Sequence, residues 1–136
     1  RLSPGAENLL AAARAAGWTT LLVSGGFTYF TDRLRQRLGL NHTLANTLEV
    51  IDGKLTGEVL GEIVDASAKA ARVKAACDVL GCSPAQAIVA GDGANDLQMM
   101  RIAGLSVAFH AKPVVRREAT LSINHAGLDA LLFRFA

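Results

Sequence analysis

Short runs of apolar and β-branched residues alternate along the chain with longer segments in which apolar residues recur at helical spacing. The short runs predict β-strands at Thr19–Val23, Leu44–Val50, Lys54–Val59, Ala87–Ala90, Leu105–Phe109 and Leu121–Ile123. The longer segments predict helices over Pro4–Ala16, Phe27–Leu38, Ser67–Leu80 and Asp96–Ala103, with further helices after Pro113 and from Gly127. Strands that alternate with helices indicate an α/β fold, a doubly wound and mostly parallel sheet with helices on both faces.

One pair of predicted strands breaks this alternation. Asp52 and Gly53 separate Leu44–Val50 from Lys54–Val59. A two-residue Asp-Gly loop between apolar runs is a strong signal for a tight turn between antiparallel strands. The sequence therefore predicts a small β-hairpin in addition to the parallel sheet.

The composition suits one well-packed domain over residues 1–136. A chain of this size buries roughly two-thirds of its unfolded surface, and 51% of its residues are hydrophobic. No apolar run approaches the ~18–20 residues of a membrane span, and no signal peptide opens the sequence. The net charge of +2 is too small to indicate nucleic acid as a partner. Cys77 and Cys82 lack metal-ligand spacing, so we expect reduced thiols in a cytoplasmic protein without a membrane partner.

The most informative chemistry lies in the turn Gly91-Asp92-Gly93-Ala94-Asn95-Asp96, which follows the apolar strand Ala87–Ala90. Asp92 is expected at the carboxyl end of that strand, where open α/β sheets bind ligands. The glycines allow close backbone approach or a positive φ. Mg²⁺ prefers carboxylate oxygens and usually takes only one or two of them from the protein. The turn therefore indicates a magnesium site that acts on a phosphate group.

Two other interpretations of this turn compete with the magnesium site. Asp and Asn are common helix N-caps and Gly is common in turns, so an isolated Gly-Asp-Gly is equally well explained as a structural turn. A dinucleotide fingerprint would need a glycine where Asp96 stands, and a carboxylate there would repel a pyrophosphate.

A second strand end supports the phosphate hypothesis. The strand Thr19–Val23 runs into Ser24, Gly25 and Gly26, which open the next predicted helix. Backbone N–H groups at a helix N-terminus, together with a serine hydroxyl, form a seat for an anion. Because ligands bind at the carboxyl edge of a parallel sheet, this turn and the Asp92 turn are expected to lie together.

Lys69 is the third candidate. It stands near the start of the Ser67–Leu80 helix, where the helix dipole disfavours a cation. A bound anion nearby would remove that objection, although a solvated lysine is the ordinary alternative. One helix and one strand separate Lys69 from Asp92, which returns the chain to the same edge of the sheet.

The three segments together resemble a known family. Val23-Ser24-Gly25-Gly26-Phe27, Ala68-Lys69 and Gly91–Leu97 are similar to the second, third and fourth motifs of the phosphoserine phosphatases, which are haloacid-dehalogenase-like hydrolases. The similarity spans Pro4 to Asp129. It implies a Rossmann-like haloacid-dehalogenase core and a Mg²⁺-dependent phosphomonoesterase of serine biosynthesis, which converts O-phosphoserine and water to serine and phosphate through an aspartyl-phosphate.

The resemblance also implies roles for the candidate residues. Lys69, Asp92 and Asp96 would be catalytic, with Asp92 binding Mg²⁺ directly and Asp96 binding it through water or orienting a ligand. Since phosphoryl transfer depends on positioning and charge stabilisation, Lys69 would neutralise the phosphoryl oxygens and the nucleophile carboxylate. The implied phosphate-binding set is Ser24, Gly25, Lys69 and Asn95.

One departure from the family concerns the nucleophile. These phosphatases attack the phosphate with an Asp of an Asp-x-Asp motif on an earlier strand, and no Asp-x-Asp pair occurs in this sequence. We therefore expect residues 1–136 alone to be inactive. The nucleophile, and the cap that selects the substrate, would come from outside this sequence.

The same departure has a consequence for the sheet. In the family fold the nucleophile strand lies between the strands of Val23 and Val89, so its absence would leave two apolar strands with unpaired edges. The two strands could pair directly, a second chain could supply a strand or self-associate there, or the segment could exist elsewhere in the molecule. The sequence leaves these three arrangements open.

Two other functions also stay open. The chain could belong to another phosphatase or phosphotransferase of the same superfamily, since cation-pumping ATPases share a Gly-Asp-Gly-x-Asn-Asp turn. The Ser24–Phe27 segment and the lack of membrane spans argue against a pump. The chain could alternatively be a non-catalytic module that binds phosphate or Mg²⁺.

Overall fold

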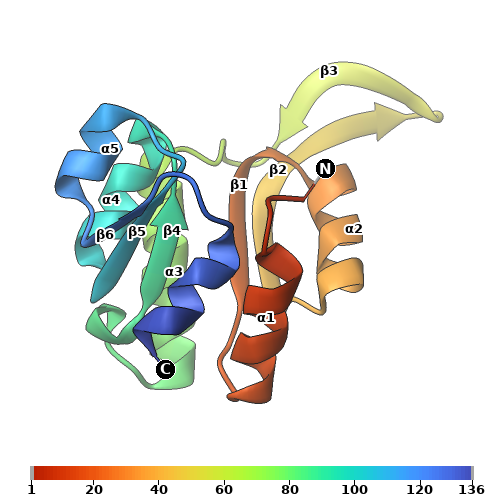
Figure 1. Cartoon of the computed structure of the whole chain (residues 1–136). Coiled ribbons are helices and arrows are strands. Elements are labelled where there is room, and N and C mark those ends of the chain that lie inside the picture. Colours follow the sequence, from red (N-terminus) through yellow and green to blue (C-terminus); the bar gives the residue numbers. More distant parts are fainter. Residues whose placement is uncertain (1, 136) are drawn as a thin grey trace.

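The computed structural model describes residues 2–135, and the strands of these residues form two three-stranded sheets (Figure 1). The first sheet has the order β1-β2-β3 and the second the order β4-β5-β6. Their bounds are β1 Leu21–Phe27, β2 His42–Ile51, β3 Lys54–Leu60, β4 Ile88–Gly91, β5 Leu105–Phe109 and β6 Leu121–Ile123. Neighbours are parallel except β2 and β3, which form the antiparallel hairpin around Asp52 and Gly53. The predicted α/β class, the mostly parallel pairing and the hairpin are confirmed.

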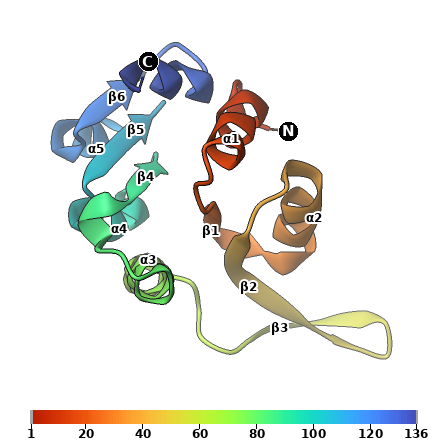
Figure 2. The ribbon, with the colours of Figure 1, turned by 90° about the horizontal axis from the view of Figure 1, so that it is seen from below.

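Helices cover the sheets on both sides, as the sequence predicts (Figure 2). Their bounds are α1 Ala6–Ala15, α2 Thr28–Leu38, α3 Ala66–Leu80, α4 Leu97–Ile102 and α5 Pro113–Glu118, with 3-10 helices η1 Pro84–Gln86, η2 Ala94–Asp96 and η3 Leu128–Arg134. The first sheet is covered by α2, while α3 lies against α4 and contacts β1. No helix within residues 2–135 is long and apolar enough to cross a membrane.

All the predicted elements are present, and three of them differ in detail from the prediction. β1 does not stop at Val23 but runs through the glycines to Phe27, because Phe27 re-enters the ladder opposite Asn46. The helix expected from Asp96 is preceded by the tighter turn η2. The last helix is a 3-10 helix, whose amides bond three residues back, as in Ala130 N–H to the Gly127 carbonyl at 3.0 Å.

The two sheets are separated at the point where the family resemblance places another strand. β1 and β4 are edge strands, and among the described residues they do not pair with each other. Figure 2 shows them facing one another across the middle of the molecule. Direct pairing, one of the three arrangements left open by the sequence, is therefore not adopted.

The first sheet with its helices forms the first half of the molecule, and the second sheet with its helices forms the second half. Two connections hold these halves at this separation. On one side the chain passes from β3 into α3, which contacts both β1 and α4. On the other side α1 meets η3: the Leu128 amide donates to the Pro4 carbonyl at 2.7 Å, and Asn8 Nδ2 donates to Asp129 Oδ2 at 3.3 Å. Gly5 has φ 78°, and a Cβ there would lie 2.3 Å from Asp129 Oδ1, so this contact requires glycine.

The main hydrophobic core lies in the second half, between α3, α4, α5 and the second sheet. Its buried members are Ala70, Val73, Cys77, Val89, Leu97, Met99, Met100, Ala108 and Val115. Leu21 and Val23 of β1 are only partly buried at its border. The first half thus reaches the core through β1, whose free edge faces the second half.

Candidate active site

A cavity of about 790 Å³ lies between β1 and β4, with α3 along its side. Much of its wall is apolar and comes from the two strands and α3. Its polar lining includes five of the six residues predicted for the site, namely Ser24, Gly25, Lys69, Asp92 and Asp96. Asn95 is exposed in the same turn and does not line this cavity. The structure therefore brings these five residues to the wall of one cavity, where β1 and β4 approach their turns.

Asp92 and Asp96 have different environments although they stand in one turn. Asp92 is exposed directly after β4, and its backbone carbonyl accepts from the Lys112 amide at 3.1 Å. Asp96 is 6% exposed and turns inward. Its Oδ2 accepts from the Asp92 amide at 3.1 Å and from the Gly93 amide at 3.2 Å. Asp96 therefore fixes the turn, and Asp92 presents the accessible carboxylate.

Lys69 forms a buried ion pair with Asp96. Lys69 Nζ donates to Asp96 Oδ1 at 2.8 Å, and both side chains are less than a tenth exposed. Burial raises the pKa of Asp96, but the hydrogen bonds from Lys69 and from the Gly93 and Asp92 amides outweigh it and lower this pKa below its usual value. Asp96 is therefore ionised at neutral pH and holds the ammonium of Lys69 at the cavity.

The position of Lys69 in the first turn of α3 now has a structural explanation. Asp65 caps the helix, since its side chain accepts from the Ala68 amide at 2.8 Å. The Lys69 amide then bonds to the Asp65 carbonyl at 3.0 Å. The sequence interpretation expected a bound anion to offset the unfavourable helix dipole at this cation, but the anion that the structure places beside Lys69 is the carboxylate of Asp96.

Gly91 allows this arrangement. An added Cβ at Gly91 would lie 2.6 Å from Asp96 Cβ and 2.8 Å from its Cγ and Oδ2. The last residue of β4 must therefore lack a side chain for Asp96 to fold back over it. This close approach, rather than a positive φ, explains the first glycine of the motif.

The Ser24 turn is a bulge within β1. Val23 pairs with Leu44 and Phe27 pairs with Asn46, so the residues between Val23 and Phe27 leave the ladder. Ser24 Oγ accepts from the Gly26 amide at 3.0 Å, which closes the turn. The exposed Gly25 lies at the cavity wall, where its backbone can approach a ligand.

One site-lining contact was missed by the sequence interpretation. The buried Asn46 of β2 donates from Nδ2 to the Gly25 carbonyl at 2.9 Å and accepts at Oδ1 from the Val64 amide at 2.7 Å. The signal was available, because asparagine is depleted in strands and this one interrupts the apolar run Leu44–Val50.

The donor set fits a magnesium ion that keeps most of its waters. Within residues 2–135 no three His, Cys, Asp or Glu side chains gather in a way that could hold a metal ion. Mg²⁺ needs only one or two protein carboxylates, and Asp92 offers an accessible one at the cavity. The oxygens of Asp96 are already engaged by Lys69 and the turn amides, so Asp96 fits an indirect role better than direct ligation.

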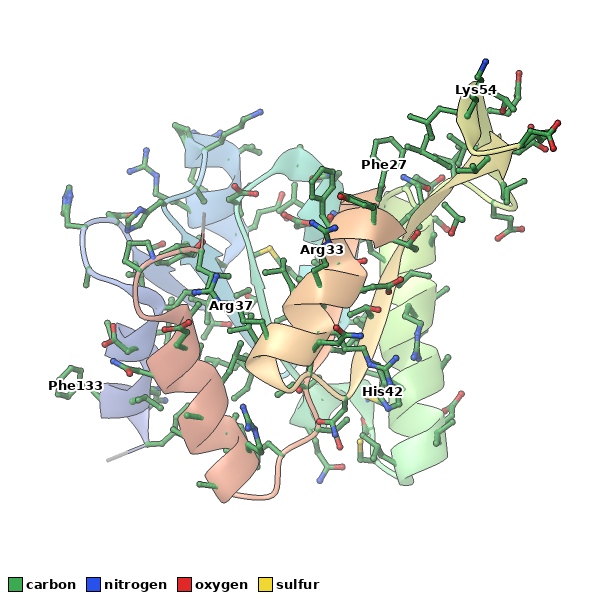
Figure 3. All side chains as sticks on the ribbon, turned by 90° about the vertical axis from the view of Figure 1, so that its right-hand side faces the viewer. Phe27, Arg33, Arg37, His42, Lys54 and Phe133 are labelled. Carbon is green, nitrogen blue, oxygen red and sulfur yellow. The ribbon has the colours of Figure 1, made fainter. Side chains whose placement is uncertain are left out.

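Other polar groups have contacts of their own outside the site. His110 has φ 44° and its Nε2 lies 2.8 Å from the Ala126 carbonyl. Arg33 stacks on Tyr29 at 4.2 Å within α2, and Arg37 of α2 pairs with Glu7 of α1 at 3.0 Å; Figure 3 labels both arginines. By contrast, Cys77 and Cys82, both free thiols, line the same cavity as the predicted site residues. Burial raises the pKa of the Cys77 thiol, and its neighbour Cys82 raises it further.

Comparison with known proteins shows similarity in sequence and in fold. Residues 1–101 match the family described as haloacid dehalogenase-like hydrolase. The phosphoserine phosphatase of Polaromonas sp. is 54% identical over 97% of this chain, which spans 58% of that protein. The unliganded crystal structure of a probable phosphoserine phosphatase from Vibrio cholerae superposes with a TM-score of 0.94, at 44% identity over 97% of this chain and 41% of that one.

A further solved structure is relevant to the chemistry. It is described as a phospho-aspartyl intermediate analogue of phosphoserine phosphatase, and it superposes with a TM-score of 0.92 at 35% identity. The match covers 98% of this chain and 64% of that chain. The present chain thus spans less than two-thirds of each of these relatives.

Proposed function

The chain belongs to the haloacid dehalogenase-like hydrolase family, and from this premise we propose that it carries the phosphate- and magnesium-binding part of a phosphoserine phosphatase site. The observation that supports the proposal most is the convergence of Ser24, Gly25, Lys69 and Asp92 on one end of the cavity between β1 and β4. The Lys69–Asp96 pair adds a buried, oriented ammonium at that end. Both features suit a phosphoryl group with negative oxygens.

In this proposal each group of the chain has a defined task. Lys69 Nζ, held by Asp96, neutralises charge on the phosphoryl oxygens as the transition state forms. The Ser24 hydroxyl and the Gly25 amide donate to the remaining oxygens, and Asn95 would add its side-chain amide from the exposed part of the Asp92 turn, outside the cavity wall. Asp92 binds Mg²⁺, and Asp96 orients the turn that presents Asp92. The single positive charge of Lys69 is offset by the negative charges of Asp92 and Asp96. A bound Mg²⁺ would supply the further positive charge that a phosphoryl group needs.

The nucleophile is proposed to come from outside residues 1–136. An aspartate at the end of a strand placed between β1 and β4 would lie near Lys69, because both free edges border the cavity that Lys69 lines. A strand there would also pair with the unpaired edges of both sheets. The substrate would be O-phosphoserine and the compartment the cytoplasm.

A phosphatase assay on two forms of the protein tests this proposal. We expect residues 1–136 to release no phosphate from O-phosphoserine with Mg²⁺, and a longer form with an Asp-x-Asp strand ahead of Arg1 to release it. Hydrolysis by residues 1–136 that Asp92→Asn abolishes would show that the nucleophile lies within this chain. An inactive longer form that still binds phosphate and Mg²⁺ would favour the non-catalytic module instead.

A further inference from the structure

Asn46 is the only residue among residues 2–135 whose side chain both donates to the Ser24–Gly26 bulge and accepts from the segment that enters α3. It is 7% exposed, on β2. Its partners fix the orientation of the amide: the Gly25 carbonyl can only accept, so it faces Nδ2, and the Val64 N–H can only donate, so it faces Oδ1. The two bonds measure 2.9 Å and 2.7 Å.

The bond to Gly25 compensates for the bulge. Where β1 leaves the β2 ladder between Val23 and Phe27, the Gly25 carbonyl lies outside the regular backbone pairing, and this part-buried group needs another donor. The Asn46 side chain supplies the missing donor. The conformation of the bulge, and with it the direction of the Gly25 amide and the Ser24 hydroxyl, therefore depends on Asn46.

The bond to Val64 connects Asn46 to the segment that leads into α3, the helix that carries Lys69. Val64 is buried and precedes Asp65, the N-cap of α3, and the Lys69 amide bonds to the Asp65 carbonyl at 3.0 Å. Gly25 also approaches this segment directly, since a Cβ on Gly25 would lie 3.9 Å from the Val64 carbonyl. The start of α3, which positions Lys69, is thus tied to the Gly25 turn through one amide.

We propose that Asn46 is a positioning residue that sets the separation between the Ser24–Gly25 turn and Lys69. This inference rests on the proposed function, in which these groups bind the same phosphate from opposite halves of the molecule. Asn46 touches neither the phosphate nor the metal. It acts by holding the Ser24–Gly25 turn and Lys69 in a fixed relative position. A phosphate can then bind to both without further ordering of the chain.

Asn41 offers a matched control at the opposite end of the same strand pair. Its Oδ1 accepts from the Thr20 amide at 2.8 Å and from the Thr20 hydroxyl at 3.1 Å, far along β1 from the Gly25 turn. Asn41→Ala therefore removes side-chain hydrogen bonds between the residues that immediately precede β1 and β2, without affecting the bulge. Asn46→Leu keeps the number and branching of the side-chain heavy atoms of Asn46 and removes both of its hydrogen bonds.

The experiment measures the affinity of the full chain for inorganic phosphate in the presence of Mg²⁺, by NMR titration. We expect Asn46→Leu to weaken phosphate binding by at least about fivefold and Asn41→Ala to change it by less than about twofold. Equal affinity of folded Asn46→Leu and wild type would overturn the inference and leave the proposed function intact. Failure of the wild-type chain to bind phosphate with Mg²⁺ would contradict the phosphate site itself, and the Asn46 role with it.

A second measurement needs no variant and decides the case if Asn46→Leu does not fold. Coupling between two interactions is reciprocal. If phosphate binds the conformation in which Asn46 bonds both Gly25 and Val64, phosphate must in turn stabilise these two hydrogen bonds. In the wild type, exchange of the Val64 amide should slow about tenfold when phosphate is at roughly ten times its Kd. The Thr20 amide, bonded to Asn41 in the same way, should not change. Val64 exchange that stays as constant as that of Thr20 would overturn the inference.

Discussion

At the residue scale, the buried Lys69–Asp96 pair organises the site more than the exposed Asp92 does. The sequence made both carboxylates of the turn candidates. Which of them is accessible and which pairs with Lys69 depends on burial, which cannot be read from the sequence. Asp96 uses both oxygens within the chain, one for Lys69 and one for the turn amides. Because both members of the pair are buried, removal of one leaves the other charge buried without a partner, which lowers the stability of the fold.

Asp96→Asn should therefore destabilise the fold. It leaves the Lys69 ammonium buried without a carboxylate, which typically costs about 3–5 kcal/mol. Glu118→Gln is the control, because Glu118 pairs with Arg101 at 2.9 Å on the surface, and exposed pairs contribute only about 0–1 kcal/mol. Urea unfolding at neutral pH measures both free energies. Equal losses in the two variants would show that the buried pair does not stabilise the protein.

The same pair predicts a pH dependence. The pKa of Asp96 is lowered in the folded state, so its stabilising contribution is present above the unfolded pKa and is lost as pH falls through the lower, folded value. The difference in unfolding free energy between wild type and Asp96→Asn should thus narrow below about pH 4, near the ordinary aspartate pKa. A difference that stays constant into acid would mean that the pKa of Asp96 is not lowered by folding.

At the element scale, strands and helices were predictable where local periodicity decides them. The Asp52-Gly53 hairpin and β5 follow the sequence closely, because turn chemistry and apolar runs are local signals. The β1 bulge was not predictable in the same way. Its return to the ladder at Phe27 depends on pairing with β2 and on the amide of Asn46, both of which are distant in sequence.

Gly91→Ala tests how closely β4 and the turn are packed. The added methyl would meet Asp96 Cβ at 2.6 Å, so either β4 or the ion pair must shift, and overpacking of this kind costs about 1–3 kcal/mol. Gly25→Ala is the control for stability, since its methyl would meet only the Val64 carbonyl at an ordinary 3.9 Å. Thermal or urea unfolding compares the two. If Gly91→Ala is as well tolerated as Gly25→Ala, glycine is not required beneath Asp96.

At the scale of the whole molecule, the family resemblance predicted a missing neighbour between two apolar strands. The structure keeps β1 and β4 apart, with their free edges on one cavity. Which of the three possible arrangements arises could not be read from the sequence, because it depends on contacts such as Leu128 to Pro4 and Asn8 to Asp129 that close the opposite side.

The open edges should make the isolated chain prone to association. Apolar strands with unpaired N–H and C=O groups pair readily with another strand. We expect sedimentation to show association that increases with concentration, and hydrogen exchange of the cavity-facing amides of Leu21–Val23 and Ile88–Ala90 to slow in parallel. Amides bonded to β2 and β5 serve as internal controls. A monomer whose cavity-facing amides are already protected would contradict open edges.

The central claim is that this chain supplies the charge-stabilising half of a phosphatase site. The most direct test is kcat/KM for O-phosphoserine with Mg²⁺, measured on the longer form with an Asp-x-Asp strand ahead of Arg1. Lys69→Ala and Asp92→Asn should each lower kcat/KM by about 10²–10³-fold, the usual effect of losing one transition-state contact. Lys74→Ala, an exposed lysine on the same helix, should leave it near the wild-type value. Near-normal kcat/KM in both site variants would contradict the account.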